Sequence, residues 1–189
     1  MRIPPIAPAD LSPEQKPLFE DMKQGIEAKF TGFVSMREDG ALVGPWAPTL
    51  RFPKFGKPWW DYIKALADNP VLPKPVREVA ILVTGARFKS RYELYAHIAV
   101  SEKVGLTDAK IGTIVAGQRP ADLTKEEAVA YDMASALVSG GPVPHPTYDA
   151  AVAAFGVDGA AELVYLVAGY CMVSAILNGF AVPVPDDAD

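Results

Sequence analysis

Apolar residues recur every three or four positions along most of the chain, in blocks separated by segments rich in proline and glycine. The first block follows Ser12–Gln15, which predicts a helix start with a serine cap and a proline in the first turn. Its apolar positions, from Leu18 to Ile26, have helical spacing, and the helix is expected to end near Lys29. The stretch 30–53 carries three glycines and three prolines, so it is predicted to be loop and turn.

Seven further blocks predict seven more helices, opened by capping residues or prolines and closed by glycines or prolines. The block Arg77–Arg87 also fits a buried strand, because Val79–Val83 is apolar without alternation. A helix is preferred, because Pro75 suits a first turn and the run continues unbroken to Ala86. Thr124–Glu127 is a capping box, and Thr147 is the expected cap of its helix. The expected ranges are 55–67, 75–87, 90–104, 109–116, 124–138, 147–155 and 159–180.

No segment shows the alternation of a β-hairpin, so the sequence predicts an all-α fold, a single domain of eight helices. The 189 residues are enough for one domain with a hydrophobic core. With 50% hydrophobic and 22% charged residues, the composition is that of a globular protein. The domain is expected to span 13–182, between an extended, proline-rich arm (1–12) and an acidic tail (183–189).

The charge and the cysteine count exclude several classes of protein. The net charge is -5 without a basic run, so neither nucleic acid nor a membrane surface is an expected partner. The one cysteine, Cys171, excludes an internal disulfide and any paired-cysteine redox site. The N-terminus lacks the apolar segment of a signal peptide, which predicts a cytoplasmic protein. Leu163–Leu177 is uncharged but shorter than the about 20 residues of a membrane span, so a core or interface helix is expected there.

Four polar residues near the middle of the chain are candidates for chemistry. Ser90, Glu93 and His97 are spaced by three and four residues, which places them on one face of one helix. A short turn at Phe88-Lys89 would return this helix along the preceding one, bringing Glu78 to the same place. A carboxylate and an imidazole held in apolar surroundings suit general acid–base catalysis. A structural pair with no catalytic role is the alternative that the same spacing allows.

The segments Arg77–Leu82, Ser90–His97 and Ala99–Thr107 resemble the core of the carboxymuconolactone decarboxylase and AhpD-like family. The resemblance extends over Ile26–Pro185, including a Gly-Pro loop at Asp39–Trp46. It implies an AhpD-like helical bundle that assembles as a trimer or hexamer. In the family's peroxidase branch, a glutamate, two cysteines and a histidine hold the proton-relay and redox positions. On this chain they correspond to Glu78, Ser90, Glu93 and His97.

The absence of both redox cysteines removes the disulfide chemistry of the peroxidase branch, because neither a hydroxyl nor a carboxylate forms a disulfide. Glu93 at the second cysteine position resembles the decarboxylase branch. The resemblance therefore implies a lyase that needs no cofactor and acts on a small organic acid or lactone. His97 would move the proton, Glu93 would orient it and Glu78 would act as a relay. An isomerase, a dehydratase or a non-catalytic ligand-binding oligomer remains the alternative.

Four other residues are candidates for substrate contacts. Ser90 lies on the same helix face as His97. Arg51 near the Gly-Pro loop would bind a substrate carboxylate, or else form a surface or interface ion pair. Trp46 in the long loop would pack, or form part of a lid or interface. His145, in a proline-rich loop, would sit at the pocket rim or be simply exposed. With two histidines and no carboxylate cluster, no metal site is expected.

Overall fold

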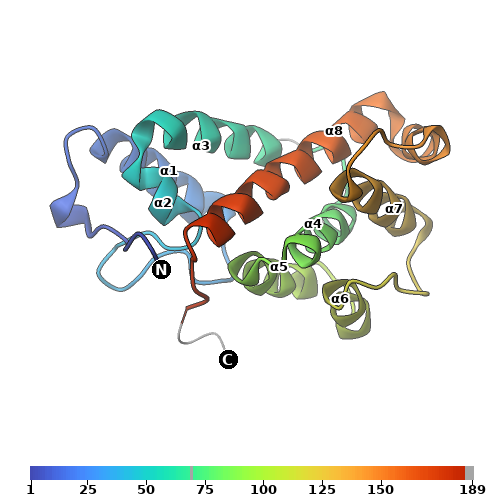
Figure 1. Cartoon of the computed structure of the whole chain (residues 1–189), viewed down its shortest axis with the longest axis horizontal. Helices are drawn as coiled ribbons and strands as arrows, with labels where there is room; N and C mark the ends of the chain where they lie inside the picture. Colours follow the sequence, from blue (N-terminus) through green and yellow to red (C-terminus); the bar gives the residue numbers. More distant parts are fainter. Residues whose placement is uncertain (69, 186–189) are drawn as a thin grey trace.

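The computed structural model describes residues 1–68 and 70–185. In these residues the chain forms eight α-helices and one short 3-10 helix, and no strand beyond a single bridge between Met36 and Leu42 (Figure 1). The prediction of an all-α single domain with eight helices is confirmed. The helices are α1 (Lys16–Lys29), α2 (Trp46–Arg51), α3 (Pro53–Ala67), α4 (Lys74–Phe88), α5 (Arg91–Lys103), α6 (Asp108–Val115), α7 (Lys125–Ser139) and α8 (His145–Gly179).

The number of helices agrees with the prediction, because the structure adds the short helix α2 and counts two predicted helices, which meet at a kink, as α8. The loop predicted at 30–53 contains α2, whose Trp46 and Leu50 are buried against neighbouring helices. Its proline lies in the first turn, where no backbone donor is lost. α8 contains both predicted helices, 147–155 and 159–180, which meet at a kink where the backbone of Gly156 is not helical (φ 71°, ψ 178°). The predicted end of a helix at Gly156 is therefore confirmed.

Helix starts also differ from the prediction in two places. Ser12 and Gln15 exchange the expected bonds, at 3.0 Å and 3.3 Å, but they close a turn and α1 begins only at Lys16. His145 opens α8 after a proline, so Thr147 is not a cap. The capping box of α7, between Thr124 and Glu127, is confirmed. Local capping patterns therefore located helix ends to within a few residues.

Two hydrophobic clusters fill the interior, and α8 contributes to both. Figure 1 shows α8 running between the group of α1, α2 and α3 and the group of α4, α5 and α7. The first, called the aliphatic core, joins α4, α6, α7 and the first half of α8. The second, called the aromatic core, joins α1, α2, α3, one face of α5 and the end of α8. The buried members of the aliphatic core include Val79, Leu82, Ile114, Met133 and Leu163; those of the aromatic core include Phe19, Trp46, Trp59, Trp60 and Tyr92.

By length and composition alone, α8 is apolar enough to cross a membrane. In this structure it packs on α3, α4, α5 and α7, and the predicted segment Leu163–Leu177 contributes buried residues to both cores, as a core helix does. Its outer face exposes Val157, Tyr165 and Met172, which repeat at spacings of eight and seven residues. Such a repeat suits helix pairing between subunits. The trimer or hexamer expected from the sequence stays a prediction.

The N-terminal arm is not wholly extended as predicted. Pro8–Asp10 forms a 3-10 helix, and Ile6 is buried, so the arm packs on the domain. The backbone N–H of Arg2 donates to the carbonyl oxygen of Phe180 at 2.9 Å, which joins the arm to the end of α8. Of the predicted acidic tail 183–189, the last four residues lie outside the described part of the chain.

Candidate active site

The site is built on the hairpin of α4 and α5. Lys89 between them adopts φ 51°, and the backbone N–H groups of Lys89 and Ser90 donate to carbonyl oxygens in the last turn of α4. The helices then approach closely at Gly85, where an added Cβ would lie 3.1 Å from Leu94 and 3.4 Å from Glu93. This tight return places α4 and α5 side by side, as the sequence predicted.

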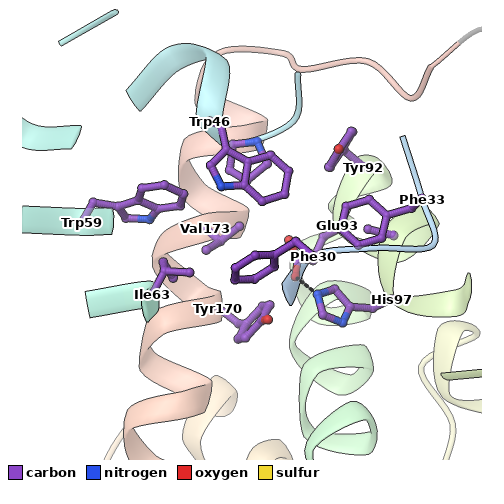
Figure 2. Close-up of a pocket in the computed structure, with 12 residues that line it drawn as sticks. Phe30, Phe33, Trp46, Trp59, Ile63, Tyr92, Glu93, His97, Tyr170 and Val173 are labelled. Atoms are coloured by element: carbon purple, nitrogen blue, oxygen red, sulfur yellow. Dashed lines mark ion pairs between the residues drawn. The ribbon is translucent and has the colours of Figure 1, made fainter. Parts of the chain in front are cut away.

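The predicted cluster of two carboxylates and one imidazole is present. Nδ1 of His97 lies 2.7 Å from Oε2 of Glu78, and Nε2 of His97 lies 3.4 Å from Oε1 of Glu93. The side chain of His97 is 14% exposed, that of Glu78 10% and that of Glu93 4%. One histidine is thus held between two carboxylates in a nearly dry site. Figure 2 shows the contact of His97 with Glu93.

Burial and mutual charge set the protonation of this cluster. Loss of hydration raises the pKa of Glu93 to about 7, against the lowering effect of His97. For His97, burial lowers the pKa, but the charge and hydrogen bond of Glu78 and the charge of Glu93 outweigh it, so its pKa is raised. The pairing with Glu78 therefore favours the imidazolium form of His97, and near neutral pH Glu93 is present in both its protonated and its ionised form.

A pocket walled by aromatic side chains opens above the cluster (Figure 2). The ring of Tyr170 meets that of His97 edge to face, with centroids 5.0 Å apart. The pocket has a volume of about 30 Å³, room for a water molecule but not for an organic ligand. The lining residues are Phe30, Phe33, Pro45, Trp46, Trp59, Ile63, Tyr92, Glu93, Ala96, His97, Tyr170 and Val173.

The segment Phe30–Gly44, here called the cover loop, closes the pocket. Phe33 stacks on Trp46 with ring centroids 6.2 Å apart, and Phe30 occupies the middle of the pocket in Figure 2. The loop is tied to α5 at Val34, whose N–H donates to Tyr95 at 3.0 Å and whose carbonyl accepts from Tyr92 at 2.6 Å. A ligand enters the pocket only if Phe30 and Phe33, which precede Val34 in the cover loop, move aside.

The four predicted substrate contacts have different outcomes. Trp46 lines the pocket and is 3% exposed. Ser90 is fully buried as the N-cap residue of α5 but is not among the pocket residues, because the cap position lies one turn before Glu93. Contact between Ser90 and a substrate stays a prediction, and the pocket lining does not support it.

Arg51 and His145 also lie outside the pocket. Arg51 ends α2, where its guanidinium lies 3.5 Å from the carbonyl oxygen of Pro4, so it holds the N-terminal arm. His145 is exposed at the first position of α8, at the far end of that helix from Tyr170 and Val173. Substrate contact by either residue stays a prediction, and the structure favours the alternatives left open for both, because sequence proximity to a loop does not fix which face of the fold a side chain reaches.

Several pocket residues were not singled out from the sequence as site residues. Trp59 and Ile63 come from α3, Tyr170 and Val173 come from α8, and Phe30 follows α1. In the sequence each occupies a position on an apolar helix face, which is also the signal of an ordinary core residue. The pattern identified them as buried, but it could not identify the cavity that they share.

Among the residues that the structure describes, no group of three histidine, cysteine, aspartate or glutamate side chains is arranged to hold a metal ion. No known family's sequence model matches the chain, and no characterised protein matches it in sequence. The comparison with solved structures is more informative.

The fold is similar to that of the debrominase Bmp8. Its apo form superposes with a TM-score of 0.73 at 13% identity, over 98% of this chain and 93% of that one. A cysteine-to-alanine variant of Bmp8 in complex with 2,3,4-tribromopyrrole superposes with a TM-score of 0.74 at 13% identity, over 100% of this chain and 94% of that one. At this level of identity the likeness shows a shared fold.

Proposed function

We propose that this protein is a cofactor-free enzyme that transfers a proton on a small organic acid or lactone, as the carboxymuconolactone decarboxylase-like lyases do. The observation that carries the proposal is the histidine held between two carboxylates beneath an aromatic pocket. General acids and bases work best when their pKa lies near the working pH. Glu93, with a pKa of about 7, meets this condition.

The geometry supports different roles for the two carboxylates from those expected on the sequence. Glu78 does not line the pocket; bound to Nδ1, it fixes the orientation and charge of the His97 ring. Glu93 and His97 both line the pocket, so these two face a bound substrate. We assign Glu93 as the base that takes a proton from carbon, and His97 as the acid that returns one. Glu78 is the positioning residue.

The structural neighbour supports a small planar ligand, and the position of this chain's cysteine argues against thiol chemistry in the pocket. Bmp8 in its complex holds 2,3,4-tribromopyrrole, a small aromatic ring, on the same fold. This chain's only cysteine, Cys171, does not line the pocket, and burial raises the pKa of its thiol. Neither debromination through a pocket thiol nor thiol peroxidase activity is therefore proposed. Cys171→Ser is the matched control for every activity measurement.

Deuterium exchange tests the proposal without knowledge of the natural substrate. A panel of small lactones, cyclic ketones and organic acids is incubated in D₂O, and deuterium uptake next to the carbonyl is followed by NMR. The wild type should accelerate uptake in at least one compound. His97→Ala and Glu93→Gln should lower that rate by about 10²–10⁴-fold, the usual contribution of a general acid or base. Cys171→Ser should match the wild type.

The rival function is a non-catalytic ligand-binding oligomer of the same fold. It predicts binding of panel compounds with no exchange above buffer, and that result would overturn the enzyme proposal. The role of Glu78 has its own readout, because the charge and the hydrogen bond of Glu78 raise the pKa of His97. In Glu78→Gln the NMR-measured pKa of His97 should fall. An unchanged His97 pKa would refute the positioning role.

A further inference from the structure

We infer that the pocket binds a neutral carbonyl compound, such as a lactone or cyclic ketone, whose oxygen accepts hydrogen bonds from the indole N–H groups of Trp46 and Trp59. The inference rests on the proposed function and narrows its substrate class from acids and lactones to uncharged carbonyl compounds. It also gives the two indoles a part in the reaction, because their N–H groups stabilise the negative charge that develops on the carbonyl oxygen.

The first observation is a set of unused donors. The indole Nε1 atoms of Trp46, Trp59 and Trp60 are buried and have no hydrogen-bond partner in the described part of the chain. Two of these residues, Trp46 and Trp59, line the pocket, and they are 3% and 5% exposed. Buried indole N–H groups normally find an acceptor, and leaving one unpaired is costly. Two such donors around one cavity indicate a ligand that brings the acceptor.

The second observation is the charge of the pocket. Of the described residues, neither a lysine nor an arginine lines it. Arg77, whose charge acts on His97, is already bound to Glu162 and to the carbonyl oxygen of Leu66. The cluster of His97, Glu78 and Glu93 is neutral or negative in sum. A substrate carboxylate would therefore enter a dry site without a cation, which is unfavourable. A carbonyl oxygen needs only donors.

The arrangement gives both ends of such a ligand a partner. Figure 2 shows Trp46 and Trp59 on one side of the pocket and the pair of His97 and Glu93 on the other, with Phe30 between them. When Phe30 moves aside, a small ring has room to bridge the two sides. The carbonyl oxygen then meets the indoles, and the neighbouring carbon meets Glu93.

A proton transfer in this position is balanced without any co-reactant. The carboxylate of Glu93 takes the proton from the carbon next to the carbonyl, and the C–H electron pair moves onto the carbonyl oxygen as an enolate. The indole N–H groups stabilise that negative charge. In an unsaturated lactone, the imidazolium of His97 then protonates a different ring carbon, and the double bond shifts. A proton passing from Glu93 to Nε2 of His97, 3.4 Å away, restores the starting state.

The probe for binding is α-angelica lactone, a small neutral lactone, and its matched control is levulinate, the ring-opened carboxylate. The three tryptophans give three indole N–H signals in a proton–nitrogen NMR spectrum, and Trp60, outside the pocket lining, is an internal reference. The lactone should move the signals of Trp46 and Trp59 to lower field and leave that of Trp60 in place. Levulinate should move none. Preferential binding of levulinate would overturn the inference.

The probe for the reaction is isomerisation of the same lactone, followed as movement of its double bond. Trp46→Phe and Trp59→Phe each keep an aromatic wall and remove one donor. Loss of one such donor should lower kcat by about 10²-fold, with little change in KM. Unchanged kcat in both variants would refute the role of the indoles. Absence of exchange with every compound would refute the proposed function instead, while shifted indole signals would still support the neutral ligand.

Discussion

The two cores of this protein are built from different residues for different ends. The buried members of the aliphatic core are leucine, isoleucine, valine, alanine and methionine, with no aromatic side chain among them. The aromatic core holds all three tryptophans, and each has a buried indole N–H without a partner in the described residues. The side chains of the aliphatic core carry no hydrogen-bonding groups, so packing alone satisfies them. The aromatic core contains unpaired indole N–H donors and a small cavity beside Glu93 and His97.

This difference suits the aliphatic core to stabilising the fold and the aromatic core to binding a ligand. Close-packed aliphatic residues lose contacts whenever one is cut back, so they stabilise the fold directly. Large aromatic residues around a cavity present flat walls and polar edges, which suits a ligand better than a tight core. The acid–base cluster lies at the boundary, because α5 and α8 contribute to both cores. The acid–base cluster thus borders the close-packed aliphatic core on one side and the pocket in the aromatic core on the other.

The largest expected difference between the cores is in the free energy of unfolding that is lost when a buried aliphatic side chain is replaced by alanine. Leu163→Ala in the aliphatic core, where Leu163 is fully buried, should lower the free energy of unfolding by about 3–5 kcal/mol. Ile63→Ala at the pocket wall should cost at least about 1 kcal/mol less, because part of its surface already faces a cavity. Urea unfolding measures both. Equal losses would show that the pocket is packed as tightly as the aliphatic core.

The second comparison is in pH dependence. Burial raises the pKa of Glu93 from 4.5 to about 7, so between these values the folded protein keeps a proton that the unfolded chain has released. Stability therefore falls as pH rises through this window, by about 3 kcal/mol in total from this group. The raised pKa of His97 acts in the same direction, since its stabilisation is lost as pH rises.

The glutamine in Glu93→Gln is uncharged at every pH, so this variant lacks the part of the pH dependence of stability that arises from Glu93. Relative to wild type, the variant should gain about 3 kcal/mol on going from about pH 4.5 to above pH 7. Urea unfolding at the two ends of the window measures the gain. A variant whose stability follows the wild type in parallel across the whole range would mean that Glu93 titrates as a solvated carboxyl.

The third test asks whether the two cores unfold together. Thr124→Ala removes the cap of α7 in the aliphatic half and should cost about 1 kcal/mol. Because α8 runs through both cores, tryptophan fluorescence, which reports only on the aromatic core, should shift by the same amount as circular dichroism. A fluorescence transition left at its original urea midpoint would show two independently unfolding halves.

The smallest expected effect is at His145. The residue is exposed and outside the pocket lining, so His145→Ala should change the free energy of unfolding by less than about 0.5 kcal/mol. Exchange activity should equal that of wild type, in contrast to His97→Ala. Reduced activity with intact stability would return His145 to the site and would require a second subunit or a large movement.

Much of the fold was predictable because helices depend on short-range patterns. Capping boxes, first-turn prolines and three- and four-residue spacing gave all-α structure and most helix bounds. The exception was tertiary in origin. A segment predicted to be loop became α2 because burial of Trp46 and Leu50 favours the helix. The break predicted at Gly156 is present as a kink within α8, where the glycine backbone leaves the helical region.

The site divides in the same way. The sequence by itself determined that Glu93 and His97 share a helix face and that Glu78 lies on the preceding helix, because a four-residue spacing and a short turn leave little freedom. Only the tertiary structure decided that Trp59, Tyr170 and the cover loop close over them and that no arginine does. The physical reason is range: hydrogen bonds along the backbone fix local geometry, whereas a cavity is enclosed by side chains from distant segments that meet only when the whole chain packs.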